Sequence, residues 1–280
     1  MTKMYQLQTR TIQQMMSYVI ITRENRCIVI DGGNTGDADY LLEFLKDKTN
    51  SEKVNIDAWF FSHVHSDHVN AFVALANSRR DEFCVKKVLF NFPSRELVAE
   101  YDYTDSTVLT MDEFYKAVEE LDTEVVILQN KDEYFFGDVR FEVLLVNDES
   151  FMRNSNVVNN SCSIVRMEVE EQTVLFLGDA GVEQGRTLLD MYGEKLRSDF
   201  VQMAHHGQNG VEKEVYEAIK PKACLWPTPL WLYDNDIGNG YGSGPWQTLT
   251  VREWMQELGV KHHFIDKDGN HEIVFPFQFD

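Results

Sequence analysis

The sequence predicts an α/β fold in which two sheets pack face to face and helices cover their outer sides. Strand-like apolar runs alternate with helix-like segments along the whole chain, and no repeat or Pro/Gly/Ser-rich linker interrupts them. Apolar residues make up 43% of the 280 residues, which is enough for a full core. We therefore expect residues 1–280 to form a single domain.

The predicted elements follow one another in two sets. The first set has strands at 17–22, 27–31, 57–61 and 88–90, helices at 39–46 and 69–75, and a mainly helical insert at 93–122. Strands resume at 125–128 and 139–146, a hairpin-like pair follows at 163–168 and 173–177, and strands at 200–204, 223–226, 264–265 and 272–275 complete the second set.

A histidine-rich segment follows the apolar run 58–61. It holds three of the chain's eight histidines and one aspartate within six positions: His63, His65, Asp67 and His68. Alternate residues of an extended segment project the same way, so His63 and His65 can reach one ion together. Asp67 and His68 lie at the start of the next helix and can turn toward a second ion. Imidazole and carboxylate ligands together suit zinc, iron or manganese.

Two later strands also end in possible metal ligands. The strand 173–177 is followed by Gly178-Asp179, and the strand 200–204 by His205-His206-Gly207. An aspartate after a glycine is ordinarily a turn or helix cap, and a histidine pair is unspecific by itself. Together with the first motif, however, they supply what a two-ion site lacks, namely a bridging carboxylate and a further imidazole.

The order Asp31, His-x-His-x-Asp-His, Gly-Asp, His resembles the metallo-β-lactamase superfamily of hydrolases, over residues 18 to 275. The resemblance implies a four-layer αββα sandwich with two divalent ions (zinc, manganese or iron) at the edge shared by the two sheets. It implies the following roles: His63 and His65 on the first ion; Asp67, His68 and either His205 or His206 on the second; Asp179 bridging both; and Asp31 ordering the histidine loop. His205 is preferred as the direct ligand because it comes first after the strand, which leaves His206 to contact the substrate.

One departure from the superfamily pattern concerns the first ion. Most members have another histidine between the first motif and the Gly-Asp, but this chain has none between His68 and His205. The segment 159–163 stands there instead and resembles the hydrolase domain of the DNA-uptake competence proteins. Its Asn160 could be a weak oxygen ligand, donate hydrogen bonds to a bound anion, or simply begin the strand in an Asx turn. Asn160 and Ser163 are therefore candidate contacts to the ions or the substrate, and the first ion should be held more loosely.

An aromatic loop is predicted near 226–247. Its Trp231, Tyr233 and Trp246 suit a lid that stacks on a substrate, although a satellite core or an oligomer interface is the slightly preferred alternative. The helical insert is the other candidate wall of the pocket.

These residues together predict a metal-dependent hydrolase. Metal-bound hydroxide would attack a phosphodiester or a similar small anionic ester, and Asp67 would both ligate and take a proton. Three alternatives stay open: a hydrolase of a neutral ester, lactone or amide; a competence-like nuclease; and a site kept for redox chemistry or for binding alone.

Charge and composition bear on partners. Acidic residues outnumber basic ones 46 to 26, for a formal charge of −20, so long nucleic acid is an unlikely partner. No run approaches the roughly 20 apolar residues of a membrane helix, and the chain's start lacks a signal peptide's apolar centre. The four cysteines form no C-x-x-C pair and are expected to be free thiols of a cytoplasmic protein. The oligomeric state is not predicted.

Overall fold

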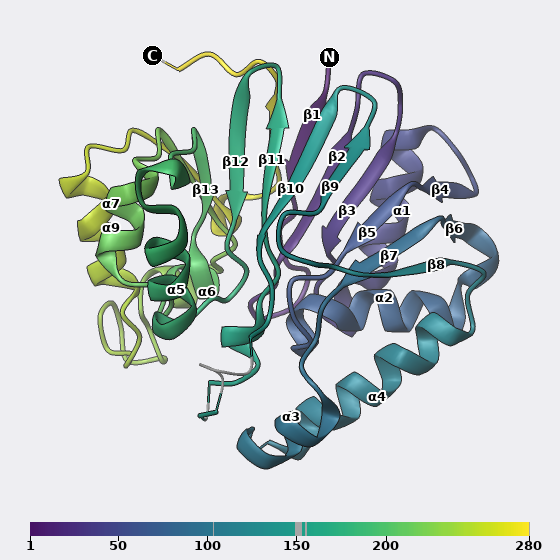
Figure 1. Cartoon of the computed structure of the whole chain (residues 1–280), viewed down its shortest axis with the longest axis horizontal. Coiled ribbons are helices and arrows are strands. Elements are labelled where there is room, and N and C mark those ends of the chain that lie inside the picture. Colours follow the sequence, from purple (N-terminus) through teal and green to yellow (C-terminus); the bar gives the residue numbers. More distant parts are fainter. Residues whose placement is uncertain (103, 149–152, 155, 280) are drawn as a thin grey trace.

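Two seven-stranded sheets form the centre of the molecule (Figure 1). The computed structural model of the chain describes residues 1–102, 104–148, 153–154 and 156–279. The first sheet has the strand order β16-β1-β2-β3-β5-β7-β8, and the second has the order β15-β14-β13-β12-β11-β10-β9. A small two-stranded sheet, β4-β6, lies apart from both.

The two sheets are built alike. In each, antiparallel strands lead into neighbouring parallel strands. Strands of the first sheet are β1 (Lys3–Gln6), β2 (Ser17–Ile21), β3 (Cys27–Asp31), β5 (Ala58–Phe60), β7 (Lys87–Phe90), β8 (Glu124–Ile127) and β16 (His271–Val274). Strands of the second are β9 (Glu133–Phe136), β10 (Val139–Leu145), β11 (Ile164–Val169), β12 (Gln172–Phe176), β13 (Phe200–Gln202), β14 (Ala223–Trp226) and β15 (His262–Ile265). The small sheet pairs β4 (Val54–Ile56) with β6 (Phe83–Val85).

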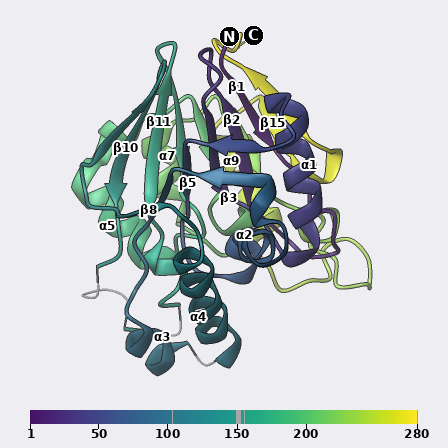
Figure 2. The ribbon, with the colours of Figure 1, turned by 90° about the vertical axis from the view of Figure 1, so that its right-hand side faces the viewer.

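Helices cover the outer side of each sheet, as the turned view shows for the first (Figure 2). The helices of the first half are α1 (Ala38–Thr49), α2 (Ser66–Ser78), α3 (Arg95–Tyr101) and α4 (Asp105–Glu119). Those of the second are α5 (Val182–Tyr192), α6 (Ala204–Gly207), α7 (Lys213–Ile219), α8 (Leu230–Tyr233) and α9 (Thr248–Glu257). Short 3-10 turns are η1 (Thr35–Asp37), η2 (Arg80–Glu82), η3 (Asn159–Ser161), η4 (Gly193–Leu196) and η5 (Asp266–Asp268).

Three separate cores confirm the four-layer αββα sandwich. One core lies between the two sheets, one between the first sheet and its helices, and one between the second sheet and its helices. Strand β3 shows why its sequence is apolar throughout. Ile28 and Ile30 face the core between the sheets, while Cys27 and Val29 face the helix side. A strand covered on both faces cannot alternate apolar and polar residues.

The structure corrects the predicted placement of the last strand. Strand β16 was expected to complete the second sheet, but it pairs antiparallel with β1 in the first. The chain passes from β15 through η5 and crosses back, so that the first and last strands lie side by side. Strand β1 was not predicted, since its Gln6 breaks the apolar run. Strand β9 was not predicted either; it is a short edge strand whose residues are alternately exposed.

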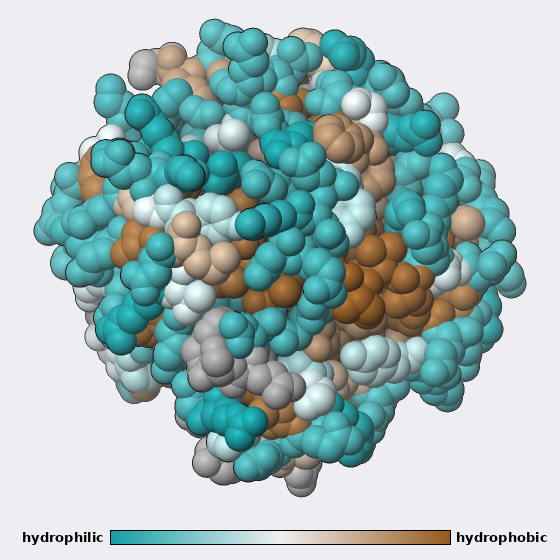
Figure 3. All heavy atoms as spheres, viewed as in Figure 1, coloured by the Kyte–Doolittle hydropathy of each residue, from teal (hydrophilic) through white to brown (hydrophobic). Residues whose placement is uncertain are grey.

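Polar side chains cover most of the face seen in Figure 3, with an apolar patch near its centre. Strand β8 ends the first sheet on that side and leaves Val125 and Ile127 about half exposed, at 47% and 51%. Within the described ranges, no helix is long and apolar enough to cross a membrane. The described cysteines are free; Cys84 is exposed, whereas Cys27, Cys162 and Cys224 are buried.

A buried glutamine joins the two sheets. The side-chain Nε2 of Gln6, on β1, donates to the backbone oxygens of Trp226 and Phe264 at 2.9 and 3.2 Å. Its Oε1 accepts a hydrogen bond from the hydroxyl of Tyr18 at 3.2 Å. Gln6 is fully buried, so no solvent replaces these bonds if the amide is removed.

We expect Gln6→Leu to lower the free energy of unfolding by about 1–3 kcal/mol, because it leaves buried polar groups without partners. Gln8→Leu, a similar change nearby at a more exposed position, should change it by roughly 0.5 kcal/mol or less. Urea titration measures both values. Equal effects of the two substitutions would show that the amide of Gln6 does not join the sheets.

Candidate metal centre

The histidine loop lies between β5 and α2, at the carboxyl end of the first sheet's parallel strands. Residue His65 has an extended backbone and serves as the N-cap of α2, so His63 precedes the helix and Asp67 and His68 lie in its first turn. His63 and His68 are completely buried. The sequence therefore brings these side chains to one place by ending a strand and beginning a helix within a few residues.

Asp31, at the end of β3, holds this loop in position. Its Oδ1 accepts a hydrogen bond from the backbone N–H of Ser62 at 2.8 Å, and its Oδ2 accepts one from the Ser62 hydroxyl at 2.7 Å. The same Oδ2 lies 2.7 Å from Nδ1 of His68. A donor at Nδ1 leaves Nε2 of His68 free to face the centre of the site. Ser62 was not singled out in the sequence, although a small hydroxyl residue directly before the first histidine was the available signal.

The second half contributes Asp179 through a tight turn after β12. Gly178 has a φ of +56°, and a Cβ there would lie 2.8 Å from the sulfur of Cys162 and 3.0 Å from Cβ of Ser62. Glycine is therefore required for both its backbone conformation and its close contacts. This turn places the Asp179 side chain, which is only 1% exposed, against the histidine loop.

The structure places His206, rather than the preferred His205, in the group that could hold an ion. His205 and His206 both have left-handed backbones, with φ of 51° and 55°, so the chain does not continue the direction of β13. His206 is fully buried and donates from Nδ1 to the backbone oxygen of Pro227 at 2.8 Å, which leaves its Nε2 facing the cluster. His205 is 20% exposed, with Nδ1 bonded to the Asn209 oxygen. The buried ring of His206 therefore lies in the cluster of possible ligands, whereas the ring of His205 lies nearer the surface.

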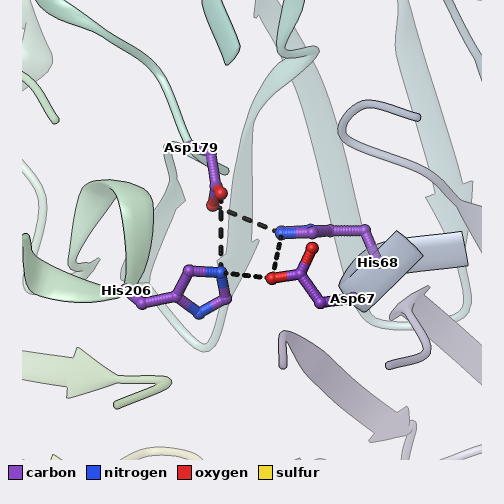
Figure 4. A group of neighbouring side chains, drawn as sticks. All are labelled: Asp67, His68, Asp179 and His206. Carbon is purple, nitrogen blue, oxygen red and sulfur yellow. Dashed lines mark ion pairs between the residues drawn. The ribbon is translucent and has the colours of Figure 1, made fainter. Parts of the chain in front are cut away.

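Figure 4 shows how Asp67, His68, Asp179 and His206 face one another. The Nε2 of His206 lies 3.1 Å from Oδ2 of Asp67 and 3.4 Å from Oδ2 of Asp179. The Nε2 of His68 lies 3.3 Å from Oδ1 of Asp179. One ligand atom from each of the four residues lies within 4.8 Å of the others, so the group could hold a metal ion.

A second group adjoins the first. It consists of His63, His65 and Asp179. The Nε2 of His63 lies 3.0 Å from Nδ1 of His65 and 3.7 Å from Oδ2 of Asp179. Asp179 belongs to both groups, so two ions could share its carboxylate. The first group offers four ligand side chains and the second only three.

The residues present fit a bound cation. Four buried polar atoms of the first group have no hydrogen-bonding partner outside the cluster and face only one another as ion pairs: Oδ2 of Asp67, Nε2 of His68, Oδ1 of Asp179 and Nε2 of His206. An unpartnered buried polar atom is costly, and a buried carboxylate is more so. All four atoms converge on the same small space, where a divalent ion would satisfy them together.

The electrostatics of the metal-free cluster also favour a cation. Burial by itself raises the pKa of Asp179, but the surrounding imidazoles, His206 foremost, hold it well below its usual value. Burial opposes a charge on His206, yet the carboxylates of Asp179 and Asp67 raise its pKa to about 10. Burial lowers the pKa of His63 well below its usual range, so this ring is neutral. In the metal-free cluster, protonated imidazoles between the carboxylates thus supply the positive charge that a metal ion would otherwise supply.

Asn160 does not face the cluster as a ligand. Its Nδ2 donates to Oε2 of Glu183 at 2.9 Å, and its Oδ1 accepts from the backbone N–H of Gln184 at 3.3 Å. Both amide atoms of Asn160 thus hydrogen-bond to the first turn of α5, which adds a capping role to the interpretations that the sequence offered. Ser163 is buried, and its backbone N–H donates to the backbone oxygen of Ser62 at 2.8 Å, so it links the two halves of the chain beside the site.

Residues of the aromatic loop line two different cavities. Trp231 lines a cavity of about 350 Å³ together with Asp67 and Asn34. Trp246 packs edge-on against Trp231, with ring centroids 4.9 Å apart. Tyr233 instead lines a cavity of about 700 Å³ that does not include the cluster. Trp231 is thus placed beside the metal centre, whereas Tyr233 is not, and its expected substrate contact is not supported.

The helical insert borders the site near His65. Asp102, at the end of α3, has its pKa lowered against the effect of burial by hydrogen bonds from Thr107 and Thr104 and by the charge of His65. This residue was not predicted, because nothing in its sequence neighbourhood marks it.

The fold and the first half of the chain match known proteins. Residues 12–145 match the model of the metallo-beta-lactamase superfamily. The metallo-beta-lactamase fold protein YhfI from Bacillus subtilis has a TM-score of 0.60 at 12% identity, and the match covers 98% of this chain and 100% of that one. A diphosphatase from the PhnP family has a TM-score of 0.52 at 12% identity, with 98% of each chain covered.

A third neighbour is longer. CmlA, a diiron β-hydroxylase from Streptomyces venezuelae, has a TM-score of 0.55 at 13% identity, and the match covers 98% of this chain but 54% of that one. At such identities the likeness concerns the fold alone. No curated protein sequence matches this chain.

We expect His206→Ala to lower metal affinity about 10- to 100-fold, because it removes a buried nitrogen aimed at the cluster. The matched substitution His205→Ala should change it far less, since that ring is partly exposed and bonded to Asn209. Competition with a chelator, together with the metal content of each variant, measures the difference. A larger loss in His205→Ala would restore the original preference.

Metal binding should release protons and strengthen as pH rises. In the metal-free protein the raised pKa of His206, about 10, keeps that ring protonated near neutral pH, and an ion must displace this proton. Apparent affinity should therefore rise with pH until the pH passes about 10. Calorimetry in buffers of different ionisation enthalpy measures the proton release. A pH-independent affinity would contradict the charged state of this imidazole.

Proposed function

We propose that this chain, whose residues 12–145 match the model of the metallo-beta-lactamase superfamily, is a hydrolase using two divalent metal ions. Zinc, manganese and iron are all candidates. The substrate we propose is a phosphodiester or a similar small anionic ester.

One observation carries the proposal. Ligand atoms from both halves of the chain converge in two adjoining groups that share Asp179, and the buried ones lack other partners. A structural metal site is normally closed, whereas a catalytic one opens to a substrate. Here Asp67 lines a cavity of about 350 Å³, so the cluster has an open side.

Bound divalent ions would supply positive charge for an anionic substrate and make water acidic enough to be a nucleophile near neutral pH. The side chains of the protein would carry out proton transfer, contact the substrate and orient the ligands. Asp67 lies in the cavity lining, so its carboxylate can accept a proton from the attacking water. His205 is partly exposed with Nε2 3.8 Å from Asp179, so it can contact the substrate at the mouth of the site. Asp31 keeps His68 oriented through its hydrogen bond to Nδ1.

A phosphoester is the preferred substrate for two reasons. Two adjacent cations neutralise both the charge of a phosphodiester and the charge that develops in its transition state. A fold neighbour is also named as a diphosphatase, in keeping with phosphoester chemistry. A neutral ester, lactone or amide is the second candidate, which the uncharged side chains around most of the cavity favour. Long nucleic acid is a poor candidate because the chain carries a formal charge of −20.

We expect Asp179→Asn to abolish hydrolysis and lower metal content, because it removes the carboxylate common to both groups. Asp67→Asn should lower kcat by about 10²- to 10⁴-fold, the usual range for a lost general base. Asp57→Asn is a matched control, since Asp57 is also buried but pairs with Arg26 and Lys86 away from the site. Full metal loading and activity in Asp179→Asn would exclude a shared two-ion site.

Turnover of bis-p-nitrophenyl phosphate and of a panel of lactones should be compared in protein loaded with manganese, iron or zinc. We expect the phosphodiester to be hydrolysed with at least one metal and the lactones to be poor substrates. Lactone turnover without phosphodiester turnover would favour the second candidate instead.

A further inference from the structure

The cavity beside the metal centre contains an unusual set of side chains for a site that takes an anion. Apart from Asp67 and Ser66, its lining consists of the amides of Gln13, Gln14 and Asn34, with Ile12 and the indole of Trp231. No lysine or arginine lines it within the residues that the structure describes. Any negative charge placed there would have only bound metal ions to neutralise it.

Arg10, the basic residue closest in sequence to the cavity lining, contacts an aromatic ring instead of the cavity. Arg10 precedes the cavity residues in sequence, but its guanidinium lies 3.9 Å from the ring centroid of Tyr40. By contrast, the separate cavity of about 700 Å³ is lined by both Arg252 and Lys261. The chain therefore does place cations around a cavity, but not around the one that adjoins Asp67.

The segment that forms one wall of this cavity is hydrogen-bonded to elements of both halves of the chain. The backbone N–H of Arg10 donates to Asp37 at 2.6 Å, and that of Thr9 donates to Asp266 at 2.8 Å. The indole Nε1 of Trp231 donates to the backbone oxygen of Ile12 at 2.9 Å. These bonds join the segment that carries Gln13 and Gln14 to elements of both halves. A wall held in this way is preorganised, so a ligand does not have to order it.

We propose that the substrate carries negative charge only at its scissile group, and that an uncharged, planar part of it lies against Trp231. This inference rests on the proposed hydrolase function and narrows its substrate class to monoanionic esters with a neutral aromatic arm. A second phosphate on that arm would lose its hydration without gaining a cation. A flat ring would gain contact with the indole, whose orientation is set by Ile12 and Trp246. A cavity of about 350 Å³ is large enough for such an arm.

The test for charge uses two substrates with the same scissile bond. One is the p-nitrophenyl ester of thymidine 5′-phosphate, and the other is the same compound with a further phosphate on the 3′ hydroxyl. We expect the metal-loaded protein to show at least about a tenfold lower kcat/KM for the second. Gln13→Lys should reduce this difference several-fold by placing a cation at the cavity. Gln129→Lys is the matched control at an exposed position outside the cavity and should leave the difference unchanged.

The test for the ring compares bis-p-nitrophenyl phosphate with methyl p-nitrophenyl phosphate, which lacks the second ring. Trp231→Ala should raise KM about five- to tenfold for the first compound only, with a smaller change in kcat, and Trp231→Phe should restore most of the loss. Equal turnover of the two thymidine esters, or equal effects of Trp231→Ala on both diesters, would overturn the inference while leaving the hydrolase function intact.

Failure of the proposed hydrolase function can be distinguished from failure of this inference about the substrate. If no ester is hydrolysed with manganese, iron or zinc, the hydrolase assignment fails, but binding still decides the inference. Calorimetry of diphenyl phosphate with the metal-loaded parent and Trp231→Ala would then support it if the variant binds several-fold more weakly. Equal binding by the two proteins would overturn it.

Discussion

Two buried aspartates and a third that is largely buried lie at the junction of the two sheets, and no lysine or arginine among the described residues pairs with them. Asp31, Asp67 and Asp179 instead face histidine rings and the Ser62 loop. Burying a carboxylate without a cation is among the most costly things a fold can do. The surrounding structure is organised around relieving that cost: five imidazoles gather here, and the strands of both sheets end here.

The two halves solve this problem in the same way. In each, a parallel strand ends and the chain turns at once through a backbone conformation that is rare for side-chain-bearing residues. Asp31 has a φ of 53° at the end of β3, while Gly178 and His206 have φ of 56° and 55° after β12 and β13. Such conformations cost free energy and tend to be concentrated at functional sites. Here they turn carboxylates and imidazoles inward at the sheet edge, where an extended chain would send them past it.

The sequence allowed us to predict those features that depend on residues close together along the chain. The histidine motif places four ligand-type side chains around one strand end, and Gly178 marks the turn before Asp179. The choice between His205 and His206 depends on two φ values that no pattern reveals. The role of Asn160 depends on where α5 begins relative to a distant segment, and the position of β16 depends on its pairing with β1. Each of these is a long-range fact, and spacing within one segment carries no information about it.

The division of the cluster between the two halves bears on the unfolded chain as well as the folded one. An ion held by His68 and His206 would tie together residues that are far apart in sequence, as a disulfide does. Such a tie lowers the entropy of the denatured ensemble, and its effect grows slowly with the length of the enclosed loop. Since the described cysteines are free, such a coordinate bond would be the chain's means of cross-linking itself, and it would be reversible. The metal supply would then govern how long the chain resists unfolding and proteolysis.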